Sequence, residues 1–76
     1  MTYNNDNNYE TFIPYDQTKE YIFVEFISLE KDQEGFSNIM VINYKNKEYR
    51  LYWDEYHSYY RGTIDVNNKK LEGFIV

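Results

Sequence analysis

The chain has 76 residues, no cysteine, a single histidine and a formal net charge of −5. Without cysteine there is no disulfide or thiolate metal site, and one histidine is too few for a zinc or iron–sulfur centre, so no cofactor or metal is expected. The longest nearly apolar run, residues 21–29, falls far short of the about 20 residues that span a bilayer, and no membrane segment is expected.

Residues 1–11 contain four asparagines around Asp6 and have little to bury, which predicts a flexible N-terminal segment followed by a single β domain over 12–76. The segment lacks the basic start and apolar stretch of a secretory signal, so a cytoplasmic location is expected. Pro14 forces the residue before it towards an extended conformation. We therefore interpret 12–16 as an arm that lies on the domain or on a partner.

The remaining chain is rich in β-branched and aromatic residues and alternates between apolar and polar positions, a pattern typical of β-strands. Both faces of 20–30 are mainly apolar, which predicts a central strand or one covered on both sides. Gly35, Lys45-Asn46-Lys47 and Asn67-Asn68 favour turns. Strands are expected at about 20–30, 36–44, 48–53, 59–66 and 71–76.

The segment 54–58 fits either a short helical turn capped by Asp54 or a loop that carries His57 outward. Five sequential strands joined by short connections favour an antiparallel meander. Such a sheet either curls into a small barrel or stays open and pairs with a copy of itself. The last strand is not capped by charge or proline, which favours a homodimer.

Chemistry near His57 is limited. Asp54 and Glu55 could orient His57 as a general base, but no nucleophile or metal accompanies them, and a chain this small has little room for a catalytic pocket. A solvated loop is the better interpretation. The three glycines stand alone, so no phosphate-binding loop is present. The chain is therefore not expected to be an enzyme.

An aromatic cluster offers a second interpretation, because exposed rings stack on the bases of single-stranded nucleic acid. The cluster consists of Tyr52, Trp53, Tyr56, His57, Tyr59 and Tyr60. Against this, phosphate neutralisation supplies most non-specific nucleic-acid affinity, and the chain carries an excess of acid. A structural or assembly role, in which surface tyrosines serve self-association, is a third alternative.

The negative charge is concentrated in the first half of the chain. Residues 1–34 hold eight Asp and Glu against two Lys, whereas residues 35–76 hold five Asp and Glu against six Lys and Arg. Acids along a strand form an array of fixed negative points about 6.6 Å apart, and a surface of one sign attracts a partner of the other. Ten tyrosines also exceed what so small a core can hold, and tyrosine is enriched at interface hot spots.

In composition, length and charge the chain resembles the small, acidic, tyrosine-rich early proteins with which bacteriophages inhibit host DNA-binding machinery, often by imitating DNA. The resemblance implies a cytoplasmic, non-enzymatic inhibitor of a basic host protein such as a sliding clamp, histone-like protein, polymerase or defence nuclease. Direct binding to nucleic acid is not expected. The predicted charged contacts are Asp16, Glu20, Glu25, Glu30, Asp32 and Glu34, and the predicted anchors are Tyr15, Trp53, Tyr56 and Tyr59. Reversing Glu30, Asp32 and Glu34 to lysine is expected to abolish binding while preserving the fold.

Overall fold

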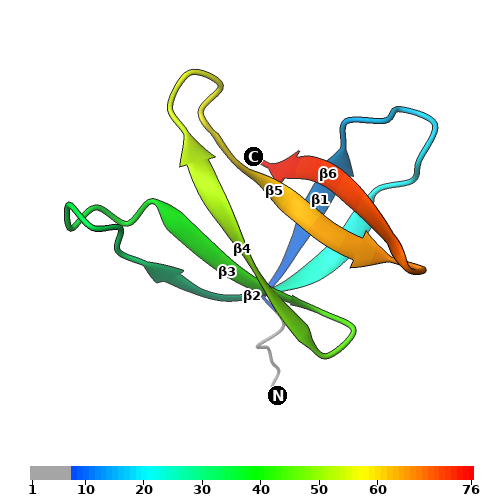
Figure 1. Cartoon of the computed structure of the whole chain (residues 1–76), viewed down its shortest axis with the longest axis horizontal. Coiled ribbons are helices and arrows are strands. Elements are labelled where there is room, and N and C mark those ends of the chain that lie inside the picture. Colours follow the sequence, from blue (N-terminus) through cyan, green and yellow to red (C-terminus); the bar gives the residue numbers. More distant parts are fainter. Residues whose placement is uncertain (1–7) are drawn as a thin grey trace, which may run out of the picture.

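Six antiparallel strands follow one another around a closed barrel in the computed structural model, which describes residues 8–76 (Figure 1). The strands are β1 (Tyr9–Pro14), β2 (Ile22–Glu30), β3 (Ile39–Tyr44), β4 (Lys47–Asp54), β5 (Tyr59–Val66) and β6 (Lys69–Ile75). Each strand pairs with its neighbours in sequence, and β1 also pairs with β6. The predicted all-β fold is confirmed, in its closed form.

β1 is the strand that comes in addition to the five predicted ones. The sequence pattern divides its residues between the flexible segment (1–11) and the arm (12–16). Phe12 explains why the segment is ordered: its side chain is fully buried in the core. Burying a phenylalanine contributes roughly 2–3 kcal/mol, enough to hold a short strand in place. The barrel therefore begins at Tyr9 rather than at residue 12, and the rest of the predicted flexible segment, residues 1–7, lies outside the described part of the chain.

The inward faces of the strands form one apolar core, as the alternation in 36–44, 48–53 and 59–66 predicts. Its buried members are Phe12, Val24, Met40, Ile42, Leu51, Ile64 and Ile75. The strand expected to start at Phe36 starts instead at Ile39, because the preceding residues belong to the β2–β3 loop. Segment 54–58 contains no helix: residues 55–58 form a turn closed by a bond of 2.7 Å from the Ser58 N–H to the Asp54 carbonyl oxygen.

A bulge in β2 changes the expected assignment of its faces. Glu25 pairs with Asn43 and Glu30 with Ile39, and the register shifts between Phe26 and Ser28. Partners four residues apart on β3 share a face, so the bulge places Glu25 and Glu30 on the same outer face of the barrel. That outer face is not covered: Phe23 is 69% exposed. β2 has a neighbouring strand on each side, as the prediction of a central strand requires, and the alternative of a strand covered on both faces is wrong.

Two seams close the barrel. β6 pairs with β1 through Ile13 and Pro14, extended by a bond from the Tyr15 N–H to the Glu72 carbonyl oxygen, so β6 has a neighbour on each side. β4 and β5 pair only near the turn that joins them and then diverge. Where they diverge, the Tyr49 hydroxyl accepts a hydrogen bond from the Asp65 N–H at 3.2 Å.

Candidate partner-binding surfaces

Five aromatic rings form a continuous ladder on the outer wall, where β1, β6, β5 and the β4–β5 turn meet. In order they are Tyr15, Phe74, Tyr59, His57 and Tyr56. Successive ring centroids lie 5.4, 4.3, 5.0 and 4.8 Å apart, and the planes of Phe74, Tyr59 and His57 are nearly parallel. Strand pairing builds the ladder. Phe74 on β6 pairs with Ile13 of β1 across the barrel seam and with Arg61 of β5 on its other side.

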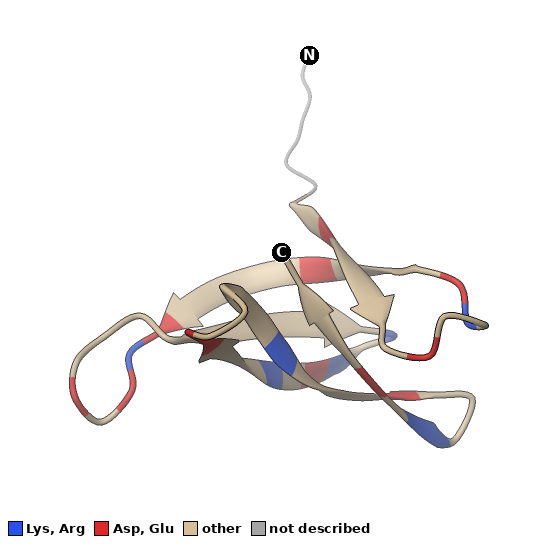
Figure 2. Cartoon of the chain, turned by 90° about the horizontal axis from the view of Figure 1, so that it is seen from above, with Lys and Arg blue, Asp and Glu red and all other residues tan. Residues whose placement is uncertain are grey.

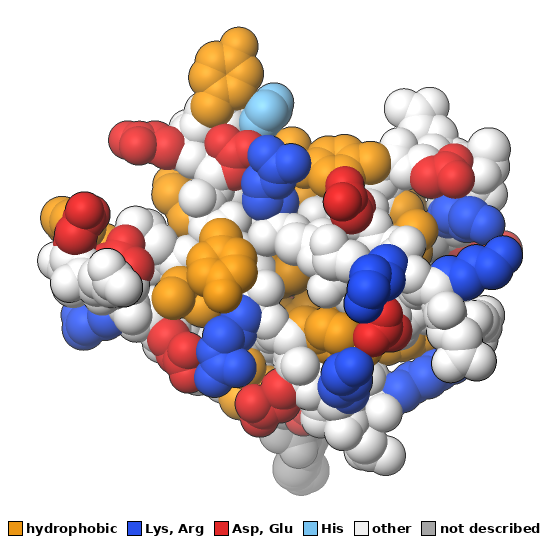
Figure 3. Space-filling model, viewed as in Figure 1, with side chains coloured by type: hydrophobic (Ala, Val, Ile, Leu, Met, Phe, Trp, Pro, Cys, Tyr) orange, Lys and Arg blue, Asp and Glu red, His pale blue; other side chains and the backbone are white. Residues whose placement is uncertain are grey.

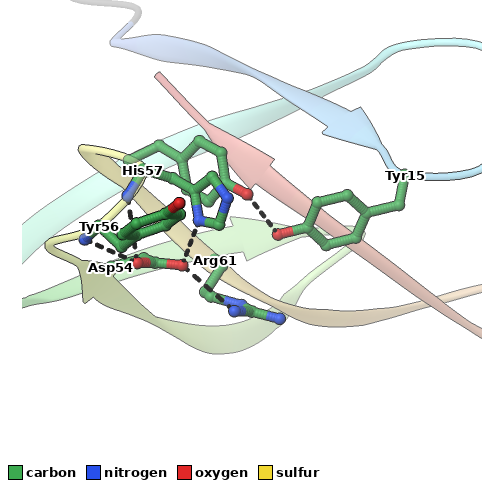
Figure 4. Close-up of polar contacts among 6 residues, drawn as sticks. Tyr15, Asp54, Tyr56, His57 and Arg61 are labelled. Carbon is green, nitrogen blue, oxygen red and sulfur yellow. Dashed lines mark hydrogen bonds and ion pairs between the residues drawn. The ribbon is translucent and has the colours of Figure 1, made fainter.

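Asp54 organises the turn that presents the upper rings of this aromatic ladder (Figure 4). One carboxylate oxygen accepts the N–H groups of Tyr56 and His57, at 3.0 and 3.3 Å. The other lies 2.9 Å from the His57 Nδ1 and accepts a bond from Arg61 at 3.2 Å. The hydrogen bonds from His57 lower the pKa of Asp54 below its ordinary value, against the opposing effect of desolvation.

Tyr15 anchors the lower end of the ladder. Its hydroxyl lies 3.0 Å from the Tyr59 hydroxyl, and the Arg61 guanidinium lies 5.8 Å from the centre of its ring. Desolvation and the hydrogen bond with Tyr59 raise the pKa of Tyr15 to about 12, although the Arg61 charge acts in the opposite direction. These groups are held by one another before any partner arrives.

Three of the four predicted anchors meet in the ladder: Tyr15, Tyr56 and Tyr59. The fourth does not. Trp53 lies outside the ladder and packs edge-on with Tyr60, at 4.9 Å between ring centroids. Phe74 was missed as a site residue, and no local signal marks it, since its role depends on pairing with strands far away in the sequence.

The predicted charged contacts lie along β2 and in the loops at its two ends. Glu25 and Glu30 occupy its outer face, Asp16 and Glu20 lie in the β1–β2 loop, and Asp32 and Glu34 lie in the β2–β3 loop. We call these six residues the acidic strip. Figure 2 shows the two loops at opposite ends of the molecule. The acids are therefore spread along β2 and its two flanking loops and are not gathered on one surface.

The spacing of the acidic strip is wider than that of DNA. From Glu20 to Glu30 the chain advances about 30 Å at roughly 3.3 Å per residue. Glu20, Glu25 and Glu30 over that length give one charge per roughly 15 Å, against one per about 3.4 Å in a single DNA strand. On the face drawn in Figure 3 acidic and basic side chains are interspersed. The strip can attract a basic surface, but it reproduces DNA only at reduced density.

Most carboxylates have no ionic partner of their own. Twelve lie in residues 8–76, and three of them form ion pairs with lysine or arginine: Glu30 with Arg50, Asp54 with Arg61, and Asp65 with Lys47 and Lys70. Nine therefore lack such a pair, against four of the eight lysines and arginines in the same residues. The unpaired excess of acid is available to a partner.

Two members of the acidic strip also accept hydrogen bonds that stabilise the loops in which they lie. One oxygen of Asp32 accepts the N–H groups of Glu34 and Phe36, and the other accepts the amide of Asn38 at 2.8 Å. Asp16 accepts the N–H and the hydroxyl of Thr18 in the same way. Replacing Asp32 by lysine would therefore disturb the β2–β3 loop as well as its charge.

A groove of about 560 Å³ runs beside the β1–β2 loop. Its lining is mixed: Lys19, Lys69 and Lys70 face Asp16 and Glu72 across a floor that includes Val66 and Leu71. Three lysines beside two carboxylates give the groove no strong preference for a ligand of either sign.

Within residues 8–76, no set of three or more His, Asp or Glu side chains is placed to hold a metal ion. In the same residues the model has no helix of the length and apolarity that crossing a bilayer requires. Comparisons with models of known protein families, with curated proteins and with solved structures gave no significant match to the chain.

Proposed function

We propose that the chain is a non-enzymatic inhibitor that binds a basic protein, of the kind that binds DNA, through the acidic strip and the aromatic ladder. The observation that carries the proposal is the unpaired negative charge. Nine carboxylates lack a lysine or arginine partner and four lysines and arginines lack a carboxylate partner, which leaves an unpaired excess of five acids in a small domain. Complementary charge steers association and excludes wrong partners.

The ladder supplies the second part of the interface. Tyr56 is 90% exposed and Tyr15 is 40% exposed, and both are held in place by the contacts described above. Rigid tyrosines fill pockets on a partner with little loss of side-chain entropy. In this proposal the carboxylates guide the encounter and the rings provide the lasting contacts. A host sliding clamp, histone-like protein, polymerase or defence nuclease would present the required basic surface.

Single-strand nucleic-acid binding remains the alternative, and the geometry favours it less. Bases stack on free aromatic faces, whereas the rings of Phe74, Tyr59 and His57 are stacked on one another. Titration of labelled oligonucleotides at low salt separates the two functions, because the proposed inhibitor binds none of them.

Charge reversal in an affinity capture from a bacterial lysate tests the proposal. The informative variant carries Glu20→Lys, Glu25→Lys and Glu34→Lys, because these three side chains make no hydrogen bond or ion pair within the described residues and their replacement spares the fold. The matched control carries Glu48→Lys, Glu55→Lys and Glu72→Lys, with the same change in charge at carboxylates that do not belong to the strip.

The wild type and the control should retain a basic protein that elutes as salt is raised, and the strip variant should not. Equal retention by all three proteins, or elution that is insensitive to salt, would contradict the proposal.

A further inference from the structure

The first half of β1 has a neighbour on one side only. Tyr9, Glu10, Thr11 and Phe12 pair with β2, whereas β6 reaches no further along β1 than Ile13. In Figure 2 the start of this strand, where the grey trace joins it, lies at the margin of the molecule. A short length of strand edge therefore borders solvent in the part of the chain that the structure describes.

Strand periodicity shows which backbone groups point to that edge. The Asn8 carbonyl oxygen accepts a bond from the Phe26 N–H on β2, whereas the Tyr15 N–H donates to Glu72 on β6. Backbone groups alternate in direction along a strand, so even-numbered residues of β1 bond to β2 and odd-numbered residues point the other way. The N–H and C=O groups of Tyr9 and Thr11 therefore face the unpaired side.

Apolar side chains flank this edge on the outer face. Tyr9 is 58% exposed, and Phe23, which lies opposite Thr11, is 69% exposed. No lysine or proline protects Tyr9 to Phe12, although natural edges commonly carry one. Edges of this type accept an additional strand, with main-chain bonds supplying affinity and side-chain contacts supplying specificity.

Glu10 decides which strand can be added. If a second copy paired with Tyr9 and Thr11 in antiparallel order about a twofold axis, Tyr9 would face Thr11 of that copy and Glu10 would face Glu10. Like charges directly opposite each other destabilise a sheet. A strand with lysine or arginine at the central position places a cation opposite Glu10 instead.

We propose that an extended, basic segment of the partner adds to the barrel as a strand beside Tyr9–Phe12, with a lysine or arginine opposite Glu10. This inference rests on the proposed function, since it takes from it a partner that is basic. It adds the mode of attachment: main-chain pairing at the edge of β1.

Amide hydrogen exchange of the full chain tests the inference, with a blocked hexapeptide of alternating valine and lysine as the probe and a valine–glutamate hexapeptide as its control. Without peptide, the Tyr9 and Thr11 amides should exchange faster than those of Glu10 and Phe12. The valine–lysine peptide should slow exchange at Tyr9 and Thr11, and the valine–glutamate peptide should not.

Three results would overturn the inference. The Tyr9 and Thr11 amides could already be protected in the free monomer, which would mean that residues 1–7 cover the edge, or become protected on dimerisation, which would mean that a second copy covers it. The third such result is that the valine–lysine peptide does not slow their exchange.

Thr11→Pro removes the N–H that faces the edge and leaves the bonds to β2, whereas Thr11→Val keeps the N–H and the branched side chain. Thr11→Pro should weaken peptide binding about tenfold, as expected for the loss of one to two hydrogen bonds, and Thr11→Val should not. Glu10→Gln gives a second readout that does not depend on proline: it should weaken binding of the valine–lysine peptide. Equal binding by Thr11→Pro and Thr11→Val, or no effect of Glu10→Gln, would refute the proposal.

The two proposals fail separately. If the partner captured from lysate is lost on reversal of the acidic strip but survives Thr11→Pro, strand addition is wrong and the proposed function stands. If strip reversal leaves capture unchanged, the proposed function itself fails.

Discussion

Substituting Gly73 by alanine tests how the barrel closes. Gly73 is buried in β6 opposite Pro14. A Cβ atom at this position would lie 2.7 and 2.8 Å from two ring carbons of Phe12 and would also collide with the Ile13 carbonyl oxygen. The Ile13 carbonyl oxygen is a backbone atom, so no side-chain rotation can relieve this contact. We therefore expect a cost near the upper end of the range for overpacking, about 3 kcal/mol.

That cost is a large fraction of the stability available. A domain of this size unfolds with a free energy of roughly 4–11 kcal/mol. At about 4–8 °C per kcal/mol, the Tm should fall by roughly 12–24 °C. Urea denaturation and calorimetry measure both quantities.

Gly62→Ala is the matched control, because it removes the same backbone freedom from the unfolded chain. Its added Cβ meets chiefly a Leu51 side-chain methyl, which can move, and lies 3.3 Å from the Arg50 carbonyl oxygen. Gly62→Ala should therefore lower the free energy of unfolding by about half as much as Gly73→Ala does. If Gly73→Ala unfolds within about 0.5 kcal/mol of the wild type, or if Gly62→Ala costs more, the close approach of β6 to β1 is refuted.

Three further predictions concern the turns and the second seam. Tyr49→Phe leaves the Asp65 N–H without its acceptor and should lower the free energy of unfolding by about 1 kcal/mol in urea titrations; no change would mean that water replaces the bond. Asn68 has a φ of 66°, a conformation that glycine adopts more easily. Asn68→Gly should therefore raise the free energy of unfolding by roughly 0.5–1 kcal/mol and raise the Tm. A lower Tm would contradict this. Hydrogen bonding lowers the pKa of Asp54 below 3.8, so its contribution to stability is present above that pH and is lost as pH falls through the lowered value. The difference in unfolding free energy between wild type and Asp54→Asn should accordingly shrink in acid, and a difference constant from pH 7 to about pH 2 would refute this role.

Much of the fold follows from local pattern. Alternation assigns the faces of β3, β4 and β5, and paired polar residues mark the tight turns at Lys45-Asn46 and Asn67-Asn68, where all four residues have positive φ. Asp54 is recognisable as a cap because its side chain accepts the N–H groups of residues two and three positions further along, Tyr56 and His57. Each of these features is decided within a few residues of chain.

The parts that sequence reasoning missed depend on distant contacts. β1 is a strand because Phe12 fills the core formed by the other five strands, and its own asparagine-rich flank suggests the opposite. The bulge in β2 is set by its pairing with β3, and it moves Glu30 onto the face of Glu25. The aromatic ladder exists only because the seam brings Phe74 beside Tyr15 and Tyr59. Three of the four predicted anchors converge for this reason, whereas the predicted acids are spread along β2 and the loops at its two ends.

Competition with DNA tests the central claim most directly. A complex of the chain with its captured basic partner is titrated with duplex DNA, and release of the chain is followed by fluorescence anisotropy. If the acidic strip and the aromatic ladder occupy the DNA-binding surface, DNA should displace the chain from its partner. A stable ternary complex with DNA would contradict the claim.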